Sequence, residues 1–411
     1  MSEGRMAVDI VDRASDFVGV DRVRELAADP EPRAIHWPIV SVDDHLLEPR
    51  DTFVGRMPEH LAERAPRIVE SNGLEYWQLG DQRLAILGAN APISWNPEDR
   101  WAGPVRFDQL RAGTYDVHAR VRDMDLVGIK ASQCFPSLTF GFAGRQFLRL
   151  GDELGYACVR AYNDWIYEDW YGAYPDRFIP CQIPWLGDID RAVAELIRNA
   201  ERGFRSVSFS ENPQKLGCPS IHTGYWDPFL AVCEETETVL NLHVGSSSET
   251  LSPSTDTPSE AVVSLFQVNA VAAAADWLFS LVTVKFPDIK IALSEGGLGW
   301  VPMLLDRLQY LEGRFPERND GGMATIWRGE LTPREALLRN FYFSAIYDPM
   351  AFRVLDCLNV DNIMMEVDYP HSDSTWPDSQ ETIRDQLSGL DEATVRKLTS
   401  ENAARLYRML I

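Results

Sequence analysis

The stretch PIVSVDDHLLEP, residues 38–49, begins as an apolar, strand-like run and ends in two acids and a histidine. Side chains two residues apart on a strand point to the same face, about 7 Å apart. Asp43 and His45 therefore face one way and Asp44 the other. Two interpretations are open: a turn whose acid caps the next helix, or two ligands of one ion with Asp44 bracing the turn.

Eight short β-rich runs recur along the chain, with helical patterns between them. Most are continuously apolar, as expected for strands of a parallel sheet that is covered on both faces. Eight strands alternating with helices predict a closed α/β TIM-type (β/α)₈ barrel. A doubly wound open sheet is the alternative, but no GxGxxG motif follows the first run. The runs are residues 38–45, 129–137, 177–185, 205–213, 238–246, 289–297, 341–348 and 362–370.

Two segments fall outside this alternation. Residues 1–37 are predicted to form a helical N-terminal extension, and the barrel takes residues 38–411. Residues 49–128, between the first two runs, are too long for a simple crossover and are rich in Trp, Pro and Gly. We expect them to form an inserted subdomain that caps the mouth of the barrel.

The composition is that of a soluble globular protein, with 45% hydrophobic and 25% charged residues among 411. A net charge of −23 argues against partners such as nucleic acid or an anionic membrane, because both attract Lys and Arg. The six cysteines follow no metal-binding spacing and the N-terminus lacks the apolar core of a signal peptide, so we expect a cytoplasmic protein. The apolar run at 268–282 contains polar residues and is expected to be a buried helix, too short to span a bilayer.

Polar residues gather where the predicted strands end, which in a barrel is the active-site face. Three of the seven histidines fall there. Two imidazoles and two carboxylates make a mixed nitrogen and oxygen donor set suited to Zn²⁺, Mn²⁺ or Fe²⁺. Each residue alone has a structural alternative, such as a core histidine or a loop-capping acid, so the prediction of a metal site rests on their coincidence. The predicted ligands are Asp43, His45, His243 and Asp368, and Glu211, Glu295, Glu366 and His371 stand at further strand ends.

At these positions the chain resembles the amidohydrolase superfamily, in its branch of decarboxylase-like barrel proteins. The resemblance lies in DDHLLEP (43–49), LHVG of the fifth run, SEGGLGWVPMLLDR (294–307) and EVDYPHSDSTWP (366–377). It covers the chain from about residue 38 to 405, and the combination of motifs is specific, whereas D-x-H alone is a weak signal. The resemblance implies a metal-centred barrel. The family's ligand positions fall on Asp43 and His45, on His243 and on Asp368.

Two positions depart from the family pattern. Glu295 stands where many members carry a histidine on strand six, and Ser210 and Glu211 stand where binuclear hydrolases carry a carboxylated lysine. A carbamate-bridged pair of zinc ions is therefore not expected. Glu295 and Glu211 are interpreted as extra metal ligands, structural braces or proton carriers. His222 is interpreted either as a catalytic residue over the site or as a plain loop residue.

The resemblance implies an enzyme acting on a small carboxylic-acid substrate, by decarboxylation or hydrolysis, with Asp368 moving a proton. Zn²⁺ is the first expectation for the cofactor, with Mn²⁺ or Fe²⁺ as alternatives. The alternative function is an O₂-dependent oxygenase of this superfamily, or the supporting subunit of such a two-subunit complex. A homo-oligomer, or a hetero-oligomer with a related subunit, is expected. Candidates to pair with the substrate carboxylate, each also readable as an ordinary surface or helix charge, are Arg50, Arg106, Arg111, His118 and Arg307.

Overall fold

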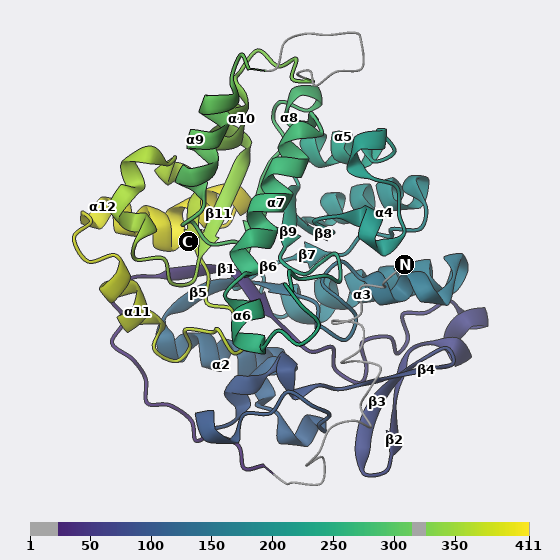
Figure 1. Ribbon diagram of the computed structural model, residues 1–411. Helices are drawn as coiled ribbons and strands as arrows, with labels where there is room; N and C mark the ends of the chain where they lie inside the picture. The colour runs from purple at the N-terminus through teal and green to yellow at the C-terminus, as the bar shows by residue number, and fades with distance from the viewer. Residues whose placement is uncertain (1–23, 315–325, 411) are drawn as a thin grey trace.

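Parallel strands close into a barrel in the computed structural model, which describes residues 24–314 and 326–410 (Figure 1). Neighbouring strands pair in the orders β1-β5-β6 and β7-β8-β9-β10-β11-β12. Nearly all their residues are buried, as the continuous apolar runs predicted, and the expected (β/α)₈ barrel is confirmed. The strands are β1 (Ile39–His45), β5 (Ile129–Phe135), β6 (Phe178–Ile179), β7 (Cys181–Gln182), β8 (Ser206–Phe209), β9 (Val239–His243), β10 (Ile291–Ser294), β11 (Phe341–Ala345) and β12 (Ile363–Met365).

Two details complete the barrel. The third strand is divided into β6 and β7 at Pro180, which has no N–H to donate to a neighbouring strand. The first and last strands meet, because Asp368 N donates to Asp43 O at 2.8 Å. His45 N likewise donates to the Tyr369 carbonyl at 2.6 Å. Closure therefore places the turn after β12 directly against the end of β1.

Helices cover the outside of the barrel, and their ends follow signals in the sequence (Figure 1). For example, α4 begins where the Asp188 side chain accepts from Arg191 N and ends at Gly203, whose φ of 109° is left-handed. The helices are α2 (Val117–Val127), α3 (Asp152–Trp165), α4 (Ile189–Arg202), α5 (Asp227–Glu235), α6 (Ser259–Val263), α7 (Phe266–Phe279), α8 (Val282–Lys285), α9 (Val301–Leu311), α10 (Pro333–Asn340), α11 (Ser379–Gln386), α12 (Glu392–Arg396) and α13 (Asn402–Tyr407).

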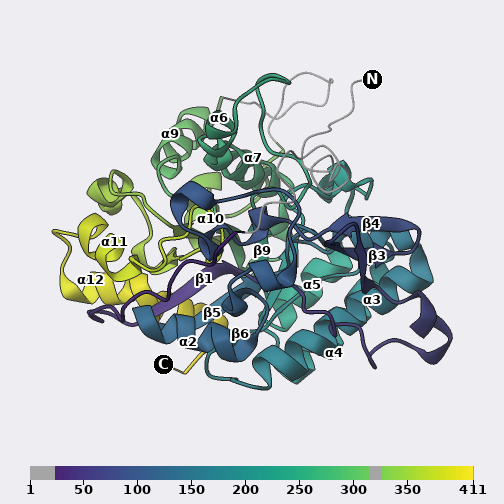
Figure 2. The ribbon, with the colours of Figure 1, turned by 90° about the horizontal axis from the view of Figure 1, so that it is seen from below.

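The long segment 49–128 contains a small antiparallel sheet, several 3₁₀ turns and α2. Figures 1 and 2 both show the sheet set to one side of the barrel. Phe53 and Trp77 of this segment are buried in the same hydrophobic core as the helices around the barrel. The segment thus shares the core of the barrel, and the division of the chain into domains stays a prediction. The strands of the small sheet are β2 (Arg67–Ser71), β3 (Leu74–Leu79) and β4 (Gln82–Ala85).

The predicted helical extension at 1–37 is not seen where the structure describes it. Residues 24–37 contain no helix, and residues 1–23 lie outside the described residues. Pro30, Pro32 and Pro38 explain the irregular course, because proline lacks the N–H that a helix interior requires.

The apolar run at 268–282 forms most of α7, but the expectation of a buried helix is only partly correct. One face is buried, through residues such as Trp277 and Leu278, while Val268 is 40% exposed. By length and composition, the stretch Ser259–Phe279 could cross a membrane. In its most apolar 18-residue part, 28% is buried inside the protein. A single such stretch is weak evidence for a membrane span.

Candidate metal centre

Four side chains that are far apart in the sequence meet at the C-terminal ends of β1, β9 and β12. The Nε2 atoms of His45 and His243 lie 3.1 Å apart. Asp43 contacts both histidines: its Oδ1 lies 3.3 Å from His45 Nε2, and its Oδ2 lies 3.3 Å from His243 Nε2. Asp368 places Oδ1 at 3.4 Å from His45 Nε2. All four residues are buried, so the structure brings together the four residues predicted as ligands.

The spacing of these atoms suits the coordination shell of one cation. A metal–ligand distance of about 2.1 Å gives edges of about 3.0 Å in an octahedron and about 3.4 Å in a tetrahedron. The observed separations of 3.1, 3.3 and 3.4 Å fall in this interval. His243 Nδ1 donates to Val244 O at 2.7 Å, which leaves its Nε2 atom as the ligand.

Unpartnered carboxylates give a second reason to place a cation here. Within the described residues, no carboxylate oxygen of Asp43 or Asp368 accepts a hydrogen bond, although all four oxygens are buried. Three of them lie 3.0–3.4 Å from histidine ring nitrogens, as ion-pair contacts only. Burying a charged group without a partner is costly, and buried carboxylates are paired or coordinate metals. The donor set therefore fits a divalent cation.

The electrostatics of the cluster also favour a positive ion. Burial, followed by the charge of Asp43, raises the pKa of Asp368 well above its usual value. Burial opposes the charged form of His243 as well, but the attraction of Asp43 and then Glu295 raises the pKa of His243 to about 10. The negative field that stabilises an imidazolium here would also stabilise a divalent cation.

Two acids of the site occupy strained backbone positions. Asp368 has a φ of 55° and Glu295 a φ of 54°, in the left-handed region that residues with a Cβ rarely adopt. Strain of this kind persists only where the surroundings hold it, commonly at functional sites. Both residues line one cavity, which links the strain to the site.

Two further acids fasten the strand ends beside the cluster. Asp44 Oδ1 accepts from Tyr369 N at 2.9 Å, and its Oδ2 accepts from the Ser132 hydroxyl. Glu48 accepts from the backbone N–H and the hydroxyl of Ser137, at 3.0 and 2.6 Å. Burial raises the pKa of both carboxyl groups to about 7. Asp44 thus braces the turn that carries Asp368.

Replacing this brace should destabilise the whole fold. Asp44→Ala leaves the buried Tyr369 N–H and Ser132 hydroxyl without their acceptor, and we expect a loss of about 3 kcal/mol in the free energy of unfolding. Urea denaturation measures this loss. Asp385→Ala, whose side chain is 68% exposed, is the control and should change stability by less than about 0.5 kcal/mol. Equal stability of the two variants would contradict the role given to Asp44.

Glu295 and His371 extend the cluster toward the cavity. Glu295 Oε2 lies 3.8 Å from His243 Nδ1, and burial, followed by Asp368, raises the pKa of Glu295 well above its usual value. His371 Nδ1 lies 3.0 Å from Asp368 Oδ1. The His371 ring stacks on that of His45 with centroids 3.9 Å apart. His371 was predicted to lie at a strand end but was not predicted to be a site residue. Its position three residues after Asp368 is the sequence signal that could have identified it.

The structure does not bring Glu211 or His222 into the cluster. Glu211 accepts from Gly245 N at 3.2 Å and from the Ser247 hydroxyl at 2.7 Å, so of its predicted roles it fills that of a brace, for the loop after β9. His222 is 44% exposed, and its Nε2 atom lies 2.7 Å from Asp276 Oδ1. The expectation that His222 lies over the site is wrong, because its partner on α7 holds it at the surface.

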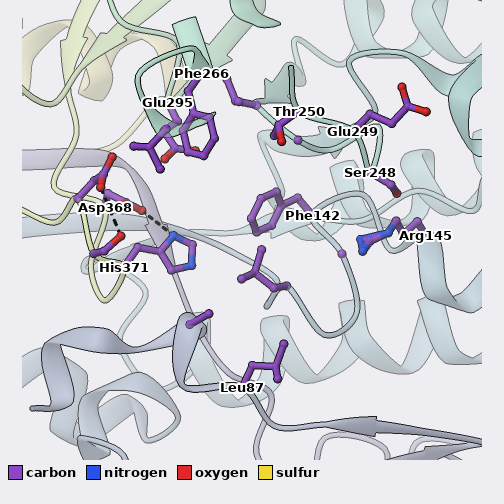
Figure 3. Close-up of a pocket in the computed structure, with 18 residues that line it drawn as sticks. Leu87, Phe142, Arg145, Ser248, Glu249, Thr250, Phe266, Glu295, Asp368 and His371 are labelled. Carbon is purple, nitrogen blue, oxygen red and sulfur yellow. Dashed lines mark hydrogen bonds and ion pairs between the residues drawn. The ribbon is translucent and has the colours of Figure 1, made fainter. Parts of the chain in front are cut away.

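A cavity of about 230 Å³ opens beside the cluster (Figure 3). Asp368, Glu295 and His371 stand at one end of it. Apolar side chains, among them Phe142 and Phe266, form much of its wall. Leu87, from the segment 49–128, also lines the cavity, so this segment reaches the site.

The cationic side chains proposed from the sequence to bind a substrate carboxylate lie elsewhere. Arg50 and Arg106 contact the same buried glutamate of β3. Arg111 forms a two-point pair with Asp123, at 2.8 and 2.6 Å. Among the described residues, none of the five candidates lines the cavity, whereas Arg145 does. Arg145 lies in a glycine-containing loop after β5 and carried no sequence signal.

Comparison with known proteins identifies the family. A model of the amidohydrolase family matches residues 150–409, more than half of the chain. The chain belongs to the amidohydrolase family. A search of curated proteins found no match. The family match includes His243, Glu295 and Asp368 of the metal centre, while Asp43 and His45 precede it.

Solved structures share the fold of this amidohydrolase along nearly its whole length. An amidohydrolase, map2389c, from Mycobacterium avium subsp. paratuberculosis has a TM-score of 0.68 at 22% identity, covering 91% of this chain and 100% of its own. The 5-carboxyvanillate decarboxylase LigW from Sphingomonas paucimobilis has a TM-score of 0.62 at 18% identity, with coverage of 91% and 100%. The 5-carboxyvanillate decarboxylase LigW2 from Novosphingobium aromaticivorans, solved with bound manganese, has a TM-score of 0.60 at 18% identity, with coverage of 91% and 97%.

Proposed function

We propose that this amidohydrolase is a metal-dependent decarboxylase of a small aromatic carboxylic acid. The observation that carries the proposal is the position of Asp368, which belongs to the metal cluster and also lines the cavity. A group in that position reaches both the cation and a substrate bound beside it. The fold is shared with two 5-carboxyvanillate decarboxylases, which supports a lyase reaction.

The residues of the site have three roles in the reaction: metal binding, proton transfer and positioning. Asp43, His45, His243 and Asp368 would hold the cation, and a bound divalent metal supplies a Lewis acid that neutralises and orients the substrate carboxylate. Asp368 also delivers a proton to the ring carbon as its bond to the carboxylate carbon breaks, so the products are CO₂ and a ring with one new C–H bond. His371, 3.0 Å from Asp368 Oδ1, positions that carboxylate.

The cavity suits a flat apolar ring. Phe142 packs against the rings of His243 and His45, with centroids 4.2 and 4.8 Å away, and lines the cavity together with Phe266. Aromatic side chains bury ring-shaped ligands at low entropic cost and exclude water from the reacting groups. Exclusion of water favours loss of CO₂ over hydrolysis.

For the identity of the metal, we propose Mn²⁺ ahead of the Zn²⁺ expected from the sequence. Carboxylate oxygens suit Mn²⁺ well, and the cluster offers two aspartates with Glu295 nearby. The manganese bound by LigW2, which has the same fold, supports this choice. Metal analysis of protein purified without added metal distinguishes the two ions.

We also propose a cytoplasmic protein that forms oligomers. All six cysteines lie in the described part of the chain and are free thiols, which supports a reducing compartment. Exposed apolar side chains such as Met303 and Met350, at 59% and 69% exposure, support association between subunits. Light scattering on the purified protein measures the oligomeric state.

The reaction is tested by measuring CO₂ release and O₂ uptake in parallel. Aromatic acids such as 5-carboxyvanillate and 2,6-dihydroxybenzoate should include a substrate that yields one CO₂ per molecule consumed, equally in air and under nitrogen. Removing the metal with a chelator should abolish turnover, and Mn²⁺ should restore it. Turnover that consumes O₂ would contradict the proposal and support an oxygenase. Bound metal without turnover of any aromatic acid would support a non-catalytic subunit.

A further inference from the structure

A buried arginine from the inserted segment lies beside the ligands of the metal centre. Arg120 belongs to α2 and is 1% exposed. Its Nη2 atom donates to the carbonyl of His45, and its guanidinium lies 4.2 Å from the centroid of the Tyr369 ring. His45 is a ligand, and Tyr369 directly follows the ligand Asp368 in the chain. One side chain therefore contacts the backbone of one ligand and the chain neighbour of another.

The other donors of Arg120 fix the position of its guanidinium. Nε donates to the Gly113 carbonyl at 2.7 Å, and Nη1 donates to Cys134 Sγ at 3.2 Å. Gly113 approaches closely because it lacks a Cβ atom, which would lie 2.5 Å from the Tyr369 hydroxyl oxygen. The guanidinium is planar and its donors point in fixed directions, so hydrogen bonds to three separate parts of the chain define its orientation.

Arg120 completes the anchoring of His45. The backbone N–H of His45 donates to the Tyr369 carbonyl at 2.6 Å, and the His45 carbonyl accepts from Arg120. Both backbone polar groups of this ligand are thus bonded at the junction between β1 and the turn after β12. The direction of a side chain follows from the orientation of its backbone, so the arginine helps to set where the His45 imidazole points.

The charge of Arg120 gives a second reason to assign it a role in geometry. Its hydrogen bonds go to two carbonyls and a thiol rather than to a carboxylate. Burial raises the pKa of Asp44 to about 7, and the attraction of Arg120 opposes that rise, so these two opposite charges interact. Burying charges is costly, and an apolar side chain in the same space is often no less stabilising. The distinct contribution of the arginine is therefore the geometry that its fork of donors imposes.

We propose that Arg120 is a positioning residue of the metal centre, through which the segment 49–128 sets the directions of the His45 and Asp368 side chains. It acts through the His45 carbonyl and the Tyr369 ring. Removing a group that orients a metal ligand from outside typically weakens metal binding by about ten- to a hundredfold. The inference rests on the metal centre of the proposed function, to which it adds a residue remote from the cation.

Mn²⁺ binding to the metal-free, full-length protein tests the inference. Competition with a chelator gives the Kd, and the electron paramagnetic resonance spectrum of bound Mn²⁺ reports the ligand geometry. Arg120→Met removes all three hydrogen bonds, and we expect the Kd to rise by about ten- to a hundredfold and the spectrum to change. Arg120→Lys keeps the charge and a donor without the planar fork, so it should recover part of the affinity.

Arg177→Met is the matched control. Arg177 also donates to carbonyls of a barrel strand, those of Ile129 and Lys130 at 2.9 and 2.8 Å, but at the start of β5 and so at the opposite end of the barrel. Its replacement should lower stability, leave the Kd for Mn²⁺ within about threefold of the wild type and leave the spectrum unchanged. Circular dichroism establishes that each variant is folded under the conditions of the binding assay.

The outcomes separate this inference from the metal centre itself. A wild-type Kd and spectrum in the folded Arg120 variants would overturn the inference and leave the metal centre standing. An equal loss of affinity in Arg177→Met would also overturn it, because general destabilisation would then explain the effect. If only Arg120→Lys folds, its Kd and spectrum decide; if neither variant folds, Arg120 is a structural residue and the inference fails. A wild-type protein that binds no Mn²⁺ would overturn the inference and the proposed function together.

Discussion

His243→Ala should release the metal and abolish turnover while the protein stays folded. The imidazole contributes Nε2 to the cluster at 3.1 Å from His45 Nε2, and no other side chain of β9 replaces it there. Loss of one of four ligands should lower metal affinity by more than about a hundredfold, because changes in the outer shell alone cost about ten- to a hundredfold. Metal content after dialysis and CO₂ release measure the two effects.

His222→Ala is the matched control for this experiment. His222 also pairs with an aspartate, at 2.7 Å, but it lies at the surface and away from the cluster. It should retain metal and turnover. Circular dichroism should show both variants folded. A His243→Ala protein that keeps one equivalent of metal would remove His243 from the ligand set.

Asp368→Asn should keep much of the metal and lose activity. The amide keeps one oxygen as a ligand but cannot accept or deliver the proton that the reaction needs. General acid–base catalysis by a positioned group contributes about 10²–10⁴-fold, so we expect kcat to fall by that factor. Metal analysis and kcat measured on the same preparation separate binding from proton transfer.

Asp378→Asn is the control for Asp368. Asp378 follows in the same segment, but it is exposed and pairs with Arg33. It should leave kcat within about twofold of the wild type. If Asp368→Asn is fully active, another group moves the proton, and the proton-transfer role of Asp368 is lost.

Much of the barrel could be predicted because its strands are buried on both faces. The continuous apolar runs then mark strands directly, as in β9 and β12, whose residues are all buried. The convergence of Asp43 with His45 followed from the two-residue period of a strand. Strand ends of a barrel share one face, and this brought His243 and Asp368 to the same place.

The rest of the site depends on loops, which carry no periodic signal. Arg145 reaches the cavity because Gly141 leaves room beneath it, and only the three-dimensional structure shows that contact. His371 lies in the turn after Asp368, where its direction is set by stacking on His45. His222 was a candidate because it is a histidine near a strand end, but its contact with Asp276 on α7 holds it outside the site. Loop side chains are placed by tertiary contacts, which local sequence does not encode.

The most direct test of the metal centre is a crystal structure of the manganese-loaded protein with anomalous scattering measured at the manganese edge. We expect one strong peak about 2.0–2.3 Å from His45 Nε2, His243 Nε2 and an oxygen of each of Asp43 and Asp368. No peak among these four residues, or a peak bound elsewhere on the barrel, would contradict it.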